Sequence, residues 1–289
     1  ECNRKKINIS LPSLRIDAFS LDVMSKVQDV KKSSLTFAPE AGTQRLRDVI
    51  NKGLTEEVIL NGAREAFEGG WNKEKLYFML GLPTETEEDM RGIAELSNEI
   101  AKVYYEAVPK EKRQGRVQIV TSTSFFVPKP FTPFQWEAQD TIETLRDKQE
   151  YLKTKITDRK IRYTHHDARV SHIEAVFALG DRRLSKALEL ARRADFAFDA
   201  WDEYFDYDKW MQIFADAGID TAFYANRQKS TDEVLPWDVI DVGVTKEFLI
   251  REKNRAYAEK TTPSCREACS ACGANCLGGK DTCCPNSKK

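Results

Sequence analysis

The sequence lacks several features that would place it in a class of protein at once. It has no apolar run approaching the ~20 residues of a membrane-spanning helix, and no signal peptide. Its 45 Lys and Arg residues are balanced by 46 Asp and Glu residues, so it has no basic excess of the kind carried by proteins that coat polyanions. These absences predict a cytoplasmic protein without a membrane anchor, and they make nucleic acid an unlikely partner.

The chain nevertheless contains enough apolar material for a sizeable core. Of its 289 residues, 41% are hydrophobic, including 15 Phe, 9 Tyr and 5 Trp, which excludes global disorder. It begins with Glu1 and enters a strand-like segment within a few residues, without an initiator Met. We therefore expect it to be a portion of a longer protein.

Strand-like and helical segments alternate through the first half of the chain. This alternation predicts an α/β fold with right-handed βαβ units and a parallel sheet. Four such units are too few for a closed eight-stranded barrel, so we expect an open sheet or an incomplete TIM-like (βα) barrel. The four strands are predicted at 7–11, 34–38, 75–80 and 117–124.

The second half of the chain has a different character. Proline becomes sparse, and helical periodicity predicts helices near 184–191 and 210–214. The aromatic run at 198–214, FDAWDEYFDYDKWMQIF, is expected to pack into a core. We therefore predict three parts, listed in order as the barrel part at 1–158, an α-rich C-terminal region at 159–252, and a linker with a cysteine-rich tail at 253–289.

The segment PEAGTQRLRDVINKG, residues 39–53, follows an apolar strand. Glu40 should lie at the carboxyl end of that strand, where βα barrels build their sites. Lys52 follows twelve residues later, across one short predicted helix. The carboxylate and the ammonium could hold the two ends of a zwitterionic ligand, or they could form a surface salt bridge before a helix-ending Gly53.

Two further segments follow predicted strands. In GLPTET, residues 81–86, Gly81 permits close backbone approach, Pro83 fixes a turn, and a Thr offers a helix cap whose free N–H groups can meet a ligand. An ordinary β–α turn would have the same sequence. In SFFVPKPFTPFQW, residues 124–136, alternating prolines predict a stiff extended segment whose aromatic side chains line a pocket or pack in the core.

Six of the seven cysteines lie in the last 25 residues. Thiolates this dense in a cytoplasmic protein indicate a metal rather than disulfides, and four thiolates suit either zinc or an iron–sulfur cluster. The alternative is a redox-exposed tail without metal. The predicted ligands are Cys265, Cys269, Cys272, Cys276 and Cys283.

Taken together, these motifs resemble radical SAM enzymes, and most closely a group of uncharacterised, cobalamin-binding-type radical SAM proteins. The resemblance covers nearly the whole chain and is carried by seven landmarks in order. They are SLPSLRID (10–17), LTFAPEAGTQRLRDVINKG (35–53), KLYFMLGLPTET (75–86), FVPKPFTPFQW (126–136), GDRRL (180–184), LPWD (235–238) and the cysteine-rich end.

The resemblance implies a partial barrel of six strands, of which this chain would carry the last four. It also implies a 4Fe-4S cluster that chelates S-adenosylmethionine and cleaves it to a 5′-deoxyadenosyl radical, with flavodoxin or ferredoxin as electron donor. The substrate is not identified. Cobalamin use would depend on an upstream domain outside this sequence.

The resemblance also assigns roles by position. Glu40 and Lys52 would bind the amino and carboxylate ends of the methionyl group. The remaining residues of the implied S-adenosylmethionine pocket are Arg15, Met79, Gly81, Leu82, Pro83, Ser122, Ser124 and Phe126.

The tail has CxxxCxxC spacing, but it follows the barrel part, whereas the family's main cluster loop follows the first barrel strand. We therefore expect zinc or an auxiliary iron–sulfur cluster in the tail, and main cluster ligands outside this chain. The isolated chain is then expected to be inactive. Two other functions remain open, a non-catalytic binding module with a structural metal tail, and nucleic-acid binding through basic stretches such as 110–116.

Overall fold

A computed structural model describes residues 35–113 and 115–274 of the chain. Within them the chain forms two compact units. The first unit comprises residues 35–124 and 147–165, and the second comprises 125–146 and 166–274. In the part of the chain that the structure describes, no helix is long and apolar enough to cross a membrane.

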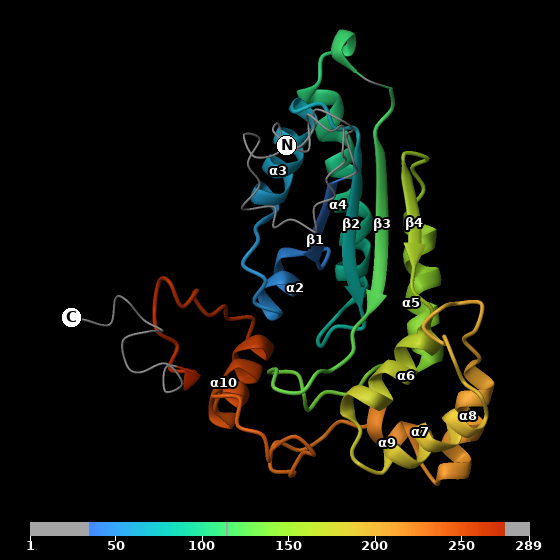
Figure 1. The fold of residues 1–289 in the computed structure, drawn as a ribbon. Coiled ribbons are helices and arrows are strands. Elements are labelled where there is room, and N and C mark those ends of the chain that lie inside the picture. Colours follow the sequence, from blue (N-terminus) through green and yellow to red (C-terminus); the bar gives the residue numbers. More distant parts are fainter. Residues whose placement is uncertain (1–34, 114, 275–289) are drawn as a thin grey trace, which may run out of the picture. The chain divides into compact units, whose positions relative to one another are not determined.

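The first unit is built on an open, four-stranded parallel sheet in the order β1-β2-β3-β4 (Figure 1). The predicted α/β class is confirmed, and the described strands form a sheet that is not closed, as expected for a partial barrel. Three predicted strands match β1, β2 and β3, whereas the strand predicted at 7–11 lies outside the described residues. The strands are β1 (Leu35–Glu40), β2 (Lys73–Leu80), β3 (Gln118–Phe125) and β4 (Ile161–His165).

The sequence analysis did not predict β4. This strand has only five residues, and just one of them, Ile161, is buried, so it lacks the apolar alternation that marks the other strands. It nevertheless pairs in parallel with β3. The sheet therefore extends beyond residue 158, where the sequence placed the end of the barrel part.

Helices alternate with these strands, and side-chain caps fix where they begin. Thr55 and Thr86 accept hydrogen bonds from the first-turn amides of α3 and α4, and Thr86 forms a full capping box with Asp89. The helix α3 packs against α4, which in turn contacts β2 and β4. The helical elements up to β4 are α2 (Gln44–Val49), α3 (Glu56–Glu68), α4 (Glu87–Ala107), the 3-10 turn η2 (Lys110–Lys112) and α5 (Ile142–Lys155).

The two faces of the sheet differ in character. On β2, Leu76, Phe78 and Leu80 are fully buried, while the alternate side chains are only half-buried. The buried side of β3 faces α4, because Thr121 Oγ1 lies 2.8 Å from Ser97 Oγ. Since successive side chains of a strand point to opposite faces, Met79 and Ser122 belong to the face away from α4.

Glu74 is an exception on the helix-covered face of β2. Its side chain is 1% exposed, and neither carboxylate oxygen has a hydrogen-bond partner among the described residues. Burial therefore raises the pKa of Glu74 well above its ordinary value. The folded chain binds a proton here that the unfolded chain releases, so the stability of the first unit falls as pH rises from the ordinary glutamate pKa toward the folded one.

We expect Glu74→Leu to stabilise the chain, by about 1–3 kcal/mol at neutral pH, because it removes an unpartnered polar group from the interior. Urea unfolding at about pH 5 and about pH 8 should show the larger gain at the higher pH. The matched control is Glu65→Leu at an exposed position of α3, which should change stability little at either pH. A Glu74→Leu chain that is no more stable than the parent at about pH 8 would contradict this expectation.

The second unit is mainly helical, as the sequence predicts. One core gathers residues from α6 to α9, with Phe214 and Ala187 fully buried within it. The helices expected near 184–191 and 210–214 correspond to α7 and α8. The helices of this unit are α6 (Ala168–Leu179), α7 (Leu184–Arg193), α8 (Tyr207–Ala217), α9 (Thr221–Ala225) and α10 (Lys246–Tyr257).

Two of the landmark motifs, FVPKPFTPFQW and LPWD, meet in a second core of this unit, beside Leu179 of α6. Trp136, Leu179 and Trp237 pack in one apolar cluster, and the Trp237 Nε1 donates to Gln135 Oε1 at 2.6 Å. Trp136 is fully buried, so core packing is the right interpretation for this aromatic residue. These motifs therefore stabilise the second unit.

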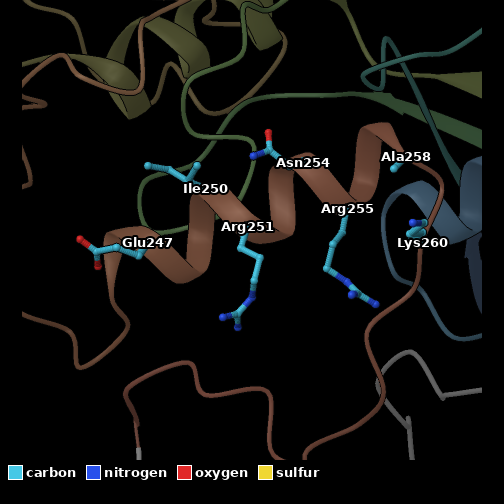
Figure 2. Close-up of a pocket in the computed structure, with 7 residues that line it drawn as sticks. All are labelled: Glu247, Ile250, Arg251, Asn254, Arg255, Ala258 and Lys260. Carbon is cyan, nitrogen blue, oxygen red and sulfur yellow. The ribbon is translucent and has the colours of Figure 1, made fainter.

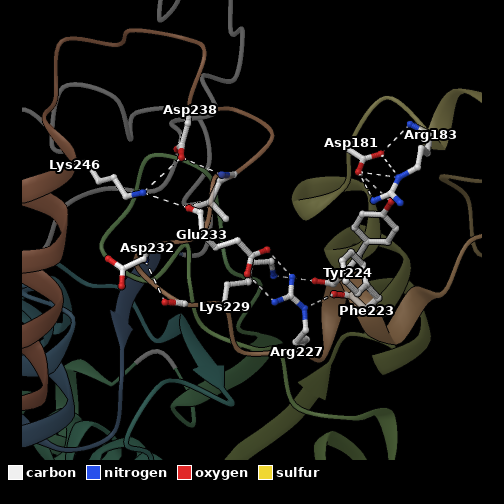
Figure 3. Close-up of polar contacts among 12 residues, drawn as sticks. Asp181, Arg183, Phe223, Tyr224, Arg227, Lys229, Asp232, Glu233, Asp238 and Lys246 are labelled. Carbon is white, nitrogen blue, oxygen red and sulfur yellow. Dashed lines mark hydrogen bonds and ion pairs between the residues drawn. The ribbon is translucent and has the colours of Figure 1, made fainter.

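Polar contacts hold α9 and the loop that follows it (Figure 3). Arg227 pairs with both carboxylate oxygens of Glu233, at 2.7 and 2.8 Å. Asp181 accepts hydrogen bonds from Arg183 and from the Tyr224 hydroxyl, and the bond from Arg183 is the main reason that its pKa falls to about 2. The GDRRL motif therefore has a structural role, because its Asp181 holds α9 in place through the Tyr224 hydroxyl.

Candidate functional site

Glu40 and Lys52 meet at the carboxyl end of β1. The Lys52 Nζ lies 2.9 Å from the Glu40 Oε1, and the two side chains are 28% and 25% exposed. Glu40 adopts a positive φ of 69°, and the register of β1 against β2 shifts just before it. A left-handed conformation costs an ordinary side chain free energy, so the surrounding contacts must hold Glu40 in place.

Arg47 supplies much of that support. Its guanidinium is fully buried and donates to the carbonyl oxygens of Ala41, Gly42 and Leu54, at 3.1, 3.3 and 3.2 Å. These bonds close the segment 41–54, which includes the short helix α2, into a compact connection between β1 and α3. This segment is called the first loop below. Since Lys52 lies in this loop, Arg47 fixes where the ammonium sits relative to Glu40.

The GLPTET segment forms a second loop, at the end of β2. Gly81 has a φ of 82°, and its backbone N–H donates to Glu85 Oε1 at 2.9 Å. The Lys148 Nζ lies 2.8 Å from the same Glu85 oxygen, whose side chain is 1% exposed. The Glu85 carboxylate, buried and paired with Lys148, therefore holds the second loop at Gly81.

Asp89, at the start of α4, ties the two loops together. Its carboxylate accepts hydrogen bonds from Thr43 and Arg45 of the first loop and from Thr86 of the second. Arg45 also donates to the carbonyl oxygen of Thr84 at 2.8 Å. Burial alone would raise the pKa of Asp89, but these hydrogen bonds outweigh it, and the pKa lies below its ordinary value.

The first loop also lies directly on α4, through two glycines. A Cβ built at Gly42 would lie 2.6 Å from the backbone carbon of Gly92, and closer still to two other backbone atoms of α4. A Cβ at Gly92 would lie 2.9 Å from Thr43 Cγ2. The absence of a side chain at Gly42 therefore sets how closely the loop approaches the helix.

The other predicted pocket residues have different outcomes. Leu82 is buried, Pro83 and Met79 are half-buried, and all three lie in or beside the second loop. Ser122 and Ser124 lie on β3, where the Ser124 Oγ is 3.5 Å from the Phe78 carbonyl oxygen. Arg15 lies outside the described residues. Phe126 is a buried residue of the second unit, and its predicted role stays a prediction.

The cysteine tail is described only in part. Cys265 and Cys269 are exposed and Cys272 is half-buried, while Cys276 and Cys283 lie outside the described residues. Within residues 35–113 and 115–274, no three His, Cys, Asp or Glu side chains come close enough to hold a metal ion. The three described thiols are therefore not gathered, and the metal site predicted for the tail stays a prediction.

A hollow of about 500 Å³ lies beside α10 in the second unit (Figure 2). Arg251 and Arg255 point to the same side of the helix, and they donate to the carbonyl oxygens of Ser270 and Thr261. These bonds attach the segment after α10 to the helix. The two guanidinium groups therefore have a structural role at this hollow.

Two comparisons with known proteins bear on this site. Residues 1–97 match the radical SAM superfamily. The resemblance seen in the sequence is confirmed for this radical SAM segment, which contains both loops of the site.

One relative extends the match along the chain. An uncharacterised protein of Methanocaldococcus jannaschii is 34% identical over 213 residues, which are 74% of this chain and 44% of that protein. The chain thus covers less than half of that relative's length.

The family implies two bound groups, S-adenosylmethionine and a 4Fe-4S cluster. The side chains of residues 1–97 suit the first of these but not the second. Glu40 and Lys52 offer one negative and one positive group at a strand end, which suits the zwitterionic methionyl part of S-adenosylmethionine. The family's cluster needs three thiolates, and residues 1–97 contain only Cys2. No step is therefore assigned to a cluster held by these residues.

Sequence reasoning missed the residues that hold the site together. Arg45, Arg47 and Asp89 are not members of the Glu40–Lys52 pair, and each acts through contacts within or between the loops. The pattern Thr-Glu-Glu-Asp at 86–89 predicts a helix cap, but it does not reveal that Asp89 also accepts from Arg45. Only the folded arrangement shows that the two motifs are linked through Asp89 and Arg45.

Proposed function

We propose that the loops after β1 and β2 bind S-adenosylmethionine, with Glu40 on its ammonium and Lys52 on its carboxylate. The observation that carries this proposal is the 2.9 Å Glu40–Lys52 pair at the carboxyl edge of the sheet. The superfamily match supports it, because residues 1–97 include both side chains.

The pair can open for a zwitterion at little cost. A partly exposed ion pair of this kind contributes about 1 kcal/mol, because water still reaches both charges. An entering methionyl group offers each side chain a new partner of opposite charge. Charge-assisted hydrogen bonds to such groups contribute about 1.5–3 kcal/mol each.

The rest of the site is already organised around this pair. Arg47 and Asp89 hold the two loops in fixed positions, so little conformational freedom remains to be lost on binding. In this proposal Met79, Leu82 and Pro83 offer apolar surface to the adenosine. The N–H of Gly81 is occupied by Glu85, so that glycine contributes close backbone approach instead.

S-Adenosylmethionine, once bound and reductively cleaved at an iron–sulfur cluster, supplies a 5′-deoxyadenosyl radical that abstracts hydrogen from a substrate. The residues of this chain bind and orient the methionyl group for that reaction. The proposal also includes a substrate from which hydrogen is abstracted and an electron donor such as flavodoxin or ferredoxin. It further includes a zinc or auxiliary iron–sulfur site in the cysteine-rich tail.

Binding of S-adenosylmethionine to the chain, measured by equilibrium dialysis, tests the proposal. We expect Glu40→Gln and Lys52→Met each to weaken binding by roughly 10–100-fold, the equivalent of one charge-assisted hydrogen bond. The matched controls are Asp158→Asn and Lys160→Met. These residues form a similarly exposed ion pair at 2.6 Å beside β4, away from the two loops, and the controls should leave binding unchanged.

Two results would contradict the proposal. One is equal binding by the parent chain and both site variants, and the other is a loss of binding as large in the Asp158 and Lys160 controls. A separate assay for 5′-deoxyadenosine with the full-length protein then distinguishes radical chemistry from a non-catalytic binding module.

A further inference from the structure

The segment 195–208 of the second unit has an unusual composition. Its fourteen residues, DFAFDAWDEYFDYD, contain six acidic and six aromatic side chains and no Lys or Arg. The sequence analysis expected its aromatic side chains to pack in the core. That interpretation, made for the run that begins at Phe198, is right for Phe205 and Tyr207, and Phe196 just before the run packs on the same core of α6 to α9.

The interpretation is wrong for the other three aromatic side chains. Phe198, Trp201 and Tyr204 are 70%, 64% and 63% exposed. Large aromatic side chains normally bury most of their surface, and contiguous exposed apolar patches mark interaction sites. These three residues are called the aromatic ledge below.

Two successive turns fold the segment so that two of the three rings lie close together. The Trp201 N–H donates to the Phe198 carbonyl and the Tyr204 N–H to the Trp201 carbonyl, each at 2.9 Å. These bonds close two turns that share Trp201, and the first turn starts at Phe198, which has a positive φ of 61°. The Phe198 and Tyr204 rings accordingly lie 6.0 Å apart.

Neighbouring contacts hold the aromatic ledge in place. The Phe196 ring packs edge-to-face on Trp210 at 5.1 Å, and the Trp210 Nε1 donates to the Asp199 carboxylate at 3.1 Å. Phe196 and Asp199, on either side of Phe198 in the chain, thus both contact Trp210 of α8. The exposed rings are held outward by an organised turn.

We propose that the aromatic ledge docks a basic segment of a partner protein, whose Lys or Arg side chains lie on the rings. Charge complementarity selects this partner, because the exposed carboxylates of Asp202 and Glu203 lie between Trp201 and Tyr204 in the chain. The faces of aromatic rings attract ammonium and guanidinium groups, and nearby carboxylates strengthen that attraction. The same carboxylates repel nucleic acids and anionic lipid surfaces.

Trp201 provides a direct probe of this surface. The chain has five tryptophans, and the other four, Trp71, Trp136, Trp210 and Trp237, are at most 6% exposed. Fluorescence quenching by soluble ions therefore reports mainly on Trp201. We expect caesium to quench it more strongly than iodide, and Trp201→Phe to remove the accessible component.

Binding is tested with a synthetic peptide in which Arg and Lys alternate with Ser, and with the same peptide carrying Glu at the basic positions. The basic peptide should protect Trp201 from acrylamide, and the acidic one should not. In fluorescence anisotropy, Trp201→Ala and the double variant Phe198→Ala with Tyr204→Ala should each weaken binding of the basic peptide roughly tenfold. Asp202→Asn with Glu203→Gln should weaken it as well.

The matched control is Phe223→Ala. Phe223 is also an exposed aromatic residue of this unit, at 42%, but Arg183 and Arg227 flank its ring. This variant should bind the basic peptide as the parent chain does. Unchanged thermal unfolding of each variant shows that the fold is intact.

Three results would overturn the proposal. They are equal binding of the acidic and basic peptides, unchanged binding by the ring variants while the charge variants lose it, and protection of Trp201 by self-association without any peptide. The last result, seen as concentration-dependent sedimentation, would identify a second copy of the chain as the occupant.

Discussion

Replacing Gly42 by alanine should destabilise the first unit by about 3 kcal/mol and should abolish binding at the Glu40–Lys52 pair. A Cβ at this position would meet three backbone atoms of α4, and backbone cannot move aside as a flexible side chain can. The loop must then separate from α4, which breaks the bonds from Thr43 and Arg45 to Asp89. Urea unfolding and dialysis against S-adenosylmethionine measure the two effects.

Gly218→Ala is the control for the Gly42 substitution. Gly218 has a φ of 73°, but a Cβ there would meet no atom within 4 Å. Only the left-handed backbone then opposes the change, at about 1–2 kcal/mol, and ligand binding should be retained. A Gly42→Ala chain as stable as the parent would show that the loop does not lie on α4 as described.

Arg47→Met should cost about 3–5 kcal/mol of unfolding free energy. The change leaves the carbonyl oxygens of Ala41, Gly42 and Leu54 buried without their donor. Arg47→Lys should recover little, because a single ammonium cannot reproduce the planar set of donors that reaches all three oxygens. Lys52 then loses its fixed position, so S-adenosylmethionine should bind weakly even under conditions in which the variant is still folded.

Arg64→Met is the matched control for Arg47. The Arg64 side chain is 41% exposed, and its ion pair with Glu106 spans 3.5 Å. Its loss should change stability by no more than about 0.5 kcal/mol. Equal effects of the two arginine substitutions would contradict the role assigned to the buried guanidinium.

Local patterns in the sequence predict much of this fold, because they reflect local physics. The apolar strands ending near Glu40 and Leu80, and the Thr caps of α3 and α4, follow from periodicity and hydrogen-bonding preferences within a few residues. The pairing of Glu40 with Lys52 was predicted because both lie beside one short helix.

Contacts between distant segments could not be predicted in the same way. Arg45 reaches Thr84 across 39 residues, and nothing near either residue indicates the other. The short strand β4 is recognised only by its pairing with β3. Composition also cannot separate Phe196, which packs on Trp210, from Trp201, which faces outward, because the turn geometry between them decides.

The central claim is that Lys52 binds the carboxylate of S-adenosylmethionine, and it is tested most directly by removing that carboxylate. The measurement compares the affinities of the parent chain and Lys52→Met for S-adenosylmethionine and for its decarboxylated analogue. The account predicts that Lys52→Met weakens binding of S-adenosylmethionine by roughly tenfold or more and leaves binding of the analogue unchanged. The reason is that removing the Lys52 ammonium and removing the ligand carboxylate abolish the same interaction. An equal loss of affinity for both ligands would contradict it.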